Sequence, residues 1–533
     1  MDWNIFYGFA GVSNTVADVA FIALFLLFSA LVLIAAVWLL PHFIYAPKAA
    51  ADADGAGAGA DGERTKKPPA FNYAAMLWLL LAIGFILRLI FVFVIKGYRA
   101  EYNALAALCD AGQKVPLADA YKSGTVSHYP LVVYLYSLAG AVASVFGVTE
   151  VSFVMPLFVK LPLILADLAA AALFYHAAKK YVNEAVGLII AGVTLLFPAF
   201  IFASAVWGSV FSLLALFAAL AFYFVAAKNY PAAIGFFSLC LLTHSDALYI
   251  YPVVAVFLIY NYIKHFRAVR AARPQGFSAL MRDKDGAAVV LIPAYIIVST
   301  ALIYLVTLPL LGGYTANFFK WLNIFYFKPL AAFGSFGHNA LNIFNLFGRN
   351  GVELVTKFPS AVFASLFGII TTALVLLVYL SRKNRANLAF LAAFVLLMLS
   401  VFYMGFSELN LMPALALLLL SFILIKDKRI LQVFGLISLG VTLNAGAVMA
   451  SAGHLGNASD YDLSSANAAY TGKELLNADG GLAVSVIASL IVISALAYAM
   501  LILLDLSMSN RRKLFKSAES TSLADALKNF FSR

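Results

Sequence analysis

The sequence predicts an all-α protein that crosses a membrane many times. Of its 533 residues, 64% are hydrophobic and 11% are charged, whereas soluble globular domains carry about 45–50% apolar and about 25% charged residues. The mean hydropathy is +0.94, and a chain with so little charge cannot cover a water-facing surface. Apolar runs of the length that an α-helix needs to cross a bilayer recur along the chain. Because there are only two cysteines, Cys109 and Cys240, a disulfide-stapled scaffold is also excluded.

Thirteen apolar runs are expected to span the membrane as helices, in which all backbone polar groups are hydrogen-bonded internally. The expected spans are 17–40, 73–96, 157–178, 183–203, 208–227, 231–246, 249–263, 287–311, 358–380, 387–404, 411–425, 430–450 and 483–505. The first belongs to an extra anchor helix within residues 1–45. It is no cleavable signal, because the start of the chain carries no positive charge and the apolar run is too long.

One further apolar segment, 130–147, is predicted to lie at the outer surface as an interfacial or re-entrant helix. If it crossed, every later loop would change sides. With 130–147 kept outside, most of the 36 Lys and Arg residues fall on one side, including a dense run between residues 264 and 284. Cytoplasmic loops carry such an excess of positive charge. We therefore expect a multi-pass plasma-membrane protein with its N-terminus outside and its C-terminus in the cytoplasm.

The polar segments divide the chain around this transmembrane region, residues 73–505. Residues 46–72 are rich in Ala, Gly and Asp and are expected to be a flexible cytoplasmic linker. Residues 506–533 form a basic cytoplasmic tail. The long outer loops are 97–156, 312–357 and 451–482, and long polar loops on one side of a bundle are where binding and catalysis concentrate. The outer boundary of the bilayer is therefore the predicted working site.

Glu101 is the strongest catalytic candidate in these loops. It follows the end of a predicted span, where a carboxylate can act as general base for a hydroxyl group. The alternative is an interfacial anchor, and His128 is likewise either a site residue or a hydrogen-bonded interface residue. No ligand spacing for a metal and no nucleotide fingerprint occurs. We expect no cofactor and no nucleic-acid partner.

Three ionisable residues fall inside predicted spans, namely Arg88, Lys160 and Asp167. Such groups are costly in lipid and are either paired or functional. An ion pair between Asp167 and Arg88 is one interpretation. A proton or ion pathway is the other, and it would make the protein a transporter. That reading predicts matching broken helices in two halves of the chain, and the sequence has no such pairing.

Five outer-face strings together resemble one family. Residues 339–344 (Asn-Ala-Leu-Asn-Ile-Phe) resemble its Asn-Ala-Phe-Asn-Leu-Trp motif, and 406–414 (Phe-Ser-Glu-Leu-Asn-Leu-Met-Pro-Ala) resemble Met-His-Glu-Arg-Tyr-Leu-Phe-Pro-Ala. Residues 205–212 (Ala-Val-Trp-Gly-Ser-Val-Phe-Ser) resemble Ala-Val-Trp-Gly-Gln-Val-Asp-Ser. Lys160-Leu161-Pro162 with Asp167, and Tyr129-Pro130, also fit. The family is the bacterial mannosyltransferase-related group of the GT-C membrane glycosyltransferases.

The resemblance covers about residues 73–450 and implies a GT-C-like bundle. It also implies transfer of a mannose-like hexose from a polyprenyl-phosphate donor to a glycan, lipid or protein acceptor. Glu101 falls where the family places an acidic residue in its first outer loop, so the resemblance implies that Glu101 is catalytic. The implied substrate-binding residues are His128, Tyr129, Trp207, His244, Asp246, Asn339, Asn342, Arg349 and Glu408.

Several polar positions of the family pattern are substituted in this chain. Ser209 and Phe211 replace Gln and Asp of the Trp-Gly motif, and Ser407 and Leu409 replace the His and Arg around Glu408. Loss of an Arg that could bind phosphate with two hydrogen bonds is not conservative. A catalytically inactive paralogue that binds a lipid-linked glycan or a partner enzyme is therefore the first alternative.

Overall fold

The computed structural model describes residues 72–95, 97–114, 128–148, 152–274, 276–311, 317–331, 339–349, 360–382, 384–451 and 480–507. Within these ranges the chain forms helices and no strands, as expected for an all-α membrane protein. The predicted anchor helix, most of the linker, loop 451–482 and the basic tail lie largely outside the described residues.

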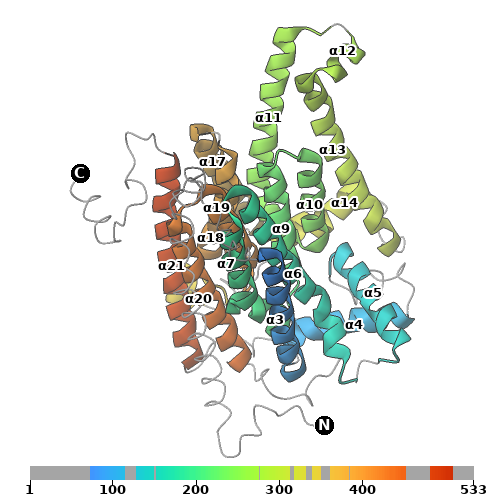
Figure 1. Ribbon diagram of the computed structural model, residues 1–533, viewed down its shortest axis with the longest axis vertical. Helices are drawn as coiled ribbons and strands as arrows, with labels where there is room; N and C mark the ends of the chain where they lie inside the picture. Colours follow the sequence, from blue (N-terminus) through green and yellow to red (C-terminus); the bar gives the residue numbers. More distant parts are fainter. Residues whose placement is uncertain are drawn as a thin grey trace, which may run out of the picture.

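The order of the helices along the chain is as follows (Figure 1). The first half contains α3 (Tyr73–Val94), α4 (Arg99–Lys114), α5 (Pro130–Val145), α6 (Met155–Tyr181), α7 (Glu184–Leu196), α8 (Pro198–Ile201), the π-helical η3 (Phe202–Trp207), α9 (Phe211–Ala226), α10 (Tyr230–Thr243), η4 (Ser245–Ile250), α11 (Tyr251–Ala272), α12 (Phe277–Arg282) and α13 (Lys284–Thr307). The second half contains η5 (Leu308–Leu310), α14 (Phe318–Leu322), η6 (Asn323–Phe327), α15 (Lys328–Ala331), α16 (Ile343–Leu346), α17 (Ser360–Arg382), η7 (Arg385–Asn387), α18 (Leu388–Phe402), α19 (Met412–Ile425), α20 (Lys428–Ser451) and α21 (Gly480–Ser507).

Eight stretches of helix in the described part are long and apolar enough to cross a membrane, or nine if the bent pair Glu184–Leu196 and Pro198–Trp207 is one span. The protein is therefore a polytopic helical membrane protein, but the expected thirteen spans are not all found. Segment 17–40 is outside the described residues. Three others form helices of 16, 14 and 14 residues, namely α9, α10 and α19. At 1.5 Å per residue they are about 21–24 Å long, shorter than the roughly 30 Å hydrocarbon core.

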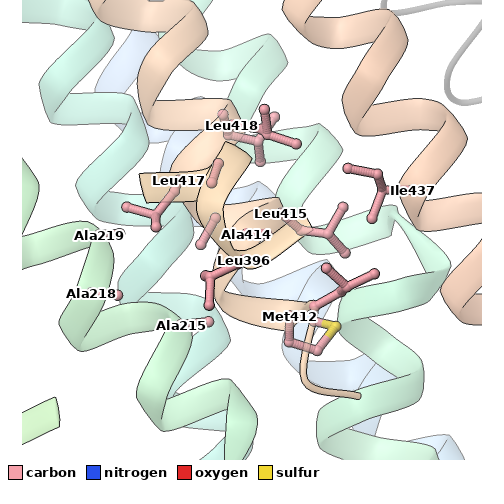
Figure 2. Close-up of a cluster of buried hydrophobic side chains, with 14 of the residues drawn as sticks. Ala215, Ala218, Ala219, Leu396, Met412, Ala414, Leu415, Leu417, Leu418 and Ile437 are labelled. Atoms are coloured by element: carbon pink, nitrogen blue, oxygen red, sulfur yellow. The ribbon is translucent and has the colours of Figure 1, made fainter. Parts of the chain in front are cut away.

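Two of these short helices, α9 and α19, pack against each other inside the bundle. In Figure 2, Ala215, Ala218 and Ala219 of α9 lie beside α19, with Leu417 pointing toward Ala219, whereas Leu415 points to the other side, toward Ile437 of α20. All six side chains are buried. Small residues on one helix allow close approach of the larger ones on its neighbour. Because α19 meets other helices rather than lipid, its length is not set by the thickness of the bilayer.

The two ends of the bundle differ in character. Helices α4 and α5 pack together at one end, whereas α11, α12 and α13 form a hairpin that projects beyond the opposite end (Figure 1). The described residues of segment 97–156 are thus largely helical. The predicted interfacial segment 130–147 corresponds to α5, a helix of 16 residues that is too short to count among the spanning helices.

Candidate functional site

The carboxylate of Glu101 is held by three hydrogen-bond donors from one turn of the chain. The indole Nε1–H of Trp207 donates to Glu101 Oε2 at 2.9 Å. The hydroxyl of Ser209 and the backbone N–H of Val210 both donate to Oε1, at 2.9 and 3.1 Å. An ionised carboxylate has about four acceptor positions, so one position on Oε2 has no donor among the described residues. The half-buried side chain is fixed in orientation and still able to receive a hydroxyl proton.

The π-helix η3 ends at Trp207 and brings its indole within hydrogen-bond distance of Glu101. Lys160 of α6 binds the backbone of the same segment. Its ammonium group donates to the carbonyls of Ala205 and Ile95 at 2.6 Å and to that of Val206 at 3.2 Å. These bonds satisfy carbonyls that irregular helix ends leave without intrahelical partners. The rings of Tyr98 and Trp207 stack with centroids 4.3 Å apart. Lys160 is therefore bound to the backbone, which disfavours the ion pathway considered for it.

Gly97 permits the close approach of the segment before α4 to the end of η3. Its φ is +126°, and a Cβ added there would lie 2.6 Å from the Trp207 carbonyl oxygen. We expect Gly97→Ala to destabilise the protein by about 1–3 kcal/mol, because both the backbone conformation and the contact oppose a side chain. Thermal unfolding in detergent measures this loss. The matched variant Gly192→Ala, where no atom lies within 4 Å, should be neutral or stabilising; equal effects of the two changes would refute the argument.

A second group of polar side chains lies between α10 and the segment before α19. His244 Nδ1 is 3.0 Å from Asp246 Oδ1, and the Asn410 side-chain amide donates to Asp246 Oδ2. The ring of Tyr129 lies 5.4 Å from that of His244, and its hydroxyl donates to the Phe325 carbonyl at 2.7 Å. Residues from four separate parts of the sequence thus meet around one histidine.

The titration of these groups follows from their burial and from their neighbours. Burial raises the pKa of Glu101, although the bonds from Ser209, Trp207 and Val210 oppose the rise. For His128, burial and the nearby His244 lower the pKa to about 4, so its neutral form prevails. Burial also acts to lower the pKa of His244, but the charges and hydrogen bond of Asp246 and the charge of Glu101 outweigh it and raise the pKa. The pKa values of the two histidines are therefore shifted in opposite directions, that of His128 downward and that of His244 upward.

The other predicted residues form a separate, buried network. Asn339 donates from its side-chain amide to Glu408 Oε1 at 2.9 Å, and its carbonyl accepts from the Asn444 side chain at 2.6 Å. Asn342 caps the N-terminus of the short helix α16 through its side chain. Glu408 is 2% exposed. Through these bonds Asn339 joins Glu408 to α20, and Asn342 is bound to α16.

Arg349 does not join either network in the structure. Its side chain is exposed just beyond α16, and its backbone N–H donates to the Phe344 carbonyl. Its phosphate contact stays a prediction, since nothing in the described part of the chain tests it. Residues 339–346 turn inward through a left-handed Asn339 (φ +47°) and the α16 cap, and Arg349 follows at the surface.

Two residues of the site were not predicted. Ser209 donates to Glu101, and Asn410 joins Asp246 to the segment that carries Glu408. The signal for Asn410 was its position, because it is a polar residue two positions after Glu408 in an otherwise apolar stretch. Among the described residues, no group of three or more His, Cys, Asp and Glu side chains is placed to hold a metal ion.

The fold and these contacts define a polytopic helical membrane protein with a buried carboxylate–histidine site at one end of the bundle. No protein-family model matches the chain, and no curated protein matches it.

Proposed function

We propose that the protein is a GT-C-type glycosyltransferase that acts at the outer face of the plasma membrane. It moves a sugar, a mannose-like hexose, from a polyprenyl-phosphate donor to a hydroxyl of a glycan, lipid or protein. The observation that carries the proposal is the fixed Glu101 carboxylate with one acceptor position left on Oε2. It lies near His244, whose pKa Asp246 and Glu101 raise against the effect of burial. The lipid tail of such a donor would remain in the bilayer while its sugar phosphate reaches this end of the bundle.

The chemistry needs one base. The acceptor oxygen attacks the anomeric carbon of the sugar, and its proton passes to Glu101. The bond between that carbon and the phosphate oxygen breaks, and polyprenyl phosphate leaves with the electron pair. A positive group near the departing oxygen stabilises the charge that develops there. Among the described residues around Glu101, His244 best fits that role, since Lys160 is bound to three backbone carbonyls.

The rate of sugar transfer is expected to form a bell against pH. On the acid side, activity rises as Glu101 loses its proton, above the ordinary carboxyl pKa because burial raises it. On the alkaline side, activity falls as His244 loses its proton, above the ordinary imidazole pKa. Initial rates measured with membranes containing the protein test this. His244→Gln should remove the alkaline limb, whereas His128→Gln should leave both limbs in place; an alkaline limb that survives His244→Gln would rule out this role.

A second candidate is a catalytically inactive member of the same fold that binds a lipid-linked glycan or a partner enzyme. The observation that favours it is the number of donors on Glu101, because three hydrogen bonds also suit a purely structural carboxylate. Both candidates predict a glycan phenotype on deletion, so only a variant that alters the chemistry separates them.

The deciding experiment compares the cell-envelope glycans of three strains by mass spectrometry. One strain lacks the gene, one regains the natural protein, and one receives Glu101→Gln at equal expression. Loss of a single sugar that only the natural protein reverses supports the transferase, and the missing mass gives the sugar class. Full restoration by both proteins favours the inactive binding partner, and unchanged glycans on deletion contradict both.

A further inference from the structure

The hairpin α11–α12–α13 lies at the end of the bundle opposite to α4, the helix that contains Glu101 (Figure 1). It carries a concentrated positive surface. Its exposed cations are Lys264, Arg267, Arg270, Arg273, Arg282 and Lys284. The same stretch contains two carboxylates, and both are used within the hairpin. Asp283 accepts from the Gly286 N–H at 2.9 Å as the cap of α13, and Asp285 lies 2.6 Å from His265 Nδ1. No acidic side chain of the described residues forms an ion pair with any of the six cations.

The contact between His265 of α11 and Asp285 of α13 lies where the apolar surface of the hairpin ends and its charged surface begins. On α11, the exposed Ile259 and Ile263 come directly before Lys264. On α13, the long apolar run begins just after Asp285. Four of the six cations lie within three residues of His265 or Asp285 along the chain, namely Lys264, Arg267, Arg282 and Lys284. Three helical residues rise about 4.5 Å, and the headgroup region adds about 5–7 Å to each side of the hydrocarbon core. Cations at this boundary are therefore expected at the depth of lipid phosphates.

Two exposed phenylalanines accompany the cations. Phe266 is 49% exposed on α11, and Phe277 is 69% exposed at the start of α12. Aromatic and cationic side chains on one short amphipathic surface are typical of segments that lie in the interface of an anionic bilayer. A soluble acidic partner would match the charges but would leave the phenylalanines without an apolar environment.

We propose that this hairpin surface binds the headgroups of anionic phospholipids in the surrounding bilayer. The phosphates pair with Lys264, Arg267, Arg282 and Lys284, and Phe266 and Phe277 enter the boundary between headgroups and acyl chains. The proposal does not depend on sugar transfer, since the surface is at the other end of the bundle.

The test uses the full-length protein in a non-ionic detergent, labelled with an environment-sensitive dye at Ser278→Cys. The natural cysteines, Cys109 and Cys240, are fully buried and do not compete for the dye. Titration with short-chain phosphatidylglycerol is expected to shift the emission and saturate, whereas short-chain phosphatidylcholine is not. Raising the salt to about 1 M should weaken the binding of phosphatidylglycerol, because exposed charges are then screened within about 3 Å.

Two double variants, each of which loses two positive charges, distinguish lipid binding at this surface from a general effect of net charge. Arg267→Gln/Arg282→Gln is expected to weaken phosphatidylglycerol binding about 30-fold, since each cation near an anionic surface contributes about fivefold. Lys179→Gln/Lys180→Gln, at the end of α6, should leave the binding within about twofold. Equal losses in the two variants, or no response to phosphatidylglycerol, would overturn the proposal. So would a response to polyglutamate without one to the lipid, which would indicate an acidic protein partner.

Discussion

Glu101→Gln is expected to lower the rate of sugar transfer by about 10²–10⁴-fold, the contribution that a positioned general base makes. The amide has nearly the same shape as the carboxylate, but it cannot take the proton of the acceptor hydroxyl. It also turns an N–H group toward one of the three donors that now bind Glu101, so one of those bonds is lost. The measurement is product formation by purified protein, with the donor identified by the glycan comparison.

The control for this experiment is a second carboxylate at the other end of the bundle. Glu184, in the first turn of α7, pairs with Lys179 and has no contact with the site. Glu184→Gln should retain full activity at equal expression. If purified Glu101→Gln, with an unchanged melting temperature, forms product at the natural rate, then Glu101 is not the base.

Asp167→Leu is expected to destabilise the protein by about 3–5 kcal/mol, because it leaves the Arg88 guanidinium buried without its counter-charge. Both groups are almost fully buried between α3 and α6. Arg88 donates to Asp167 Oδ2 from Nε at 3.1 Å and from Nη2 at 2.9 Å. Ser204 donates to the same oxygen at 2.7 Å. Thermal unfolding in detergent measures the loss.

The double variant Arg88→Met/Asp167→Leu should recover most of that stability, since it removes both charges together. Arg88 also donates from Nη1 to the Leu195 carbonyl at 2.8 Å, so recovery is expected to be incomplete. If Asp167→Leu alone is as stable as the natural protein, the ion pair with Arg88 does not stabilise the fold. The same network disfavours the ion pathway considered for Arg88. Five hydrogen bonds to α3, α6, α7 and η3 hold its guanidinium in place.

Much of the fold follows from the apolar runs alone. Eleven of the twelve expected spans from 73–96 onward each correspond to one main helix in the structure, and 183–203 corresponds to the bent pair Glu184–Leu196 and Pro198–Trp207. Hydropathy cannot give their lengths, however, because α9, α10 and α19 are shorter than a bilayer-crossing helix. Length follows bilayer thickness only where a helix faces lipid, and α19 is enclosed by other helices. The pairing of Arg88 with Asp167 was predicted, since charges in lipid require a partner.

The site residues also divide into those that the sequence predicted and those contacts that only the tertiary structure shows. Position at the ends of apolar runs selected Glu101 and His128, and the family resemblance implied Trp207, Tyr129, His244 and Asp246. Only the tertiary structure shows that Trp207 donates to Glu101 and that Asp246 lies beside His244. Only the structure places Glu408 against Asn339 and leaves Arg349 outside. The physical reason is that hydropathy indicates only which segments lie in lipid and which lie near water. A hydrogen bond depends in addition on the direction in which each side chain points. Direction is set by the π-helical turn at Trp207, the left-handed Asn339 and the packing of helices distant in sequence.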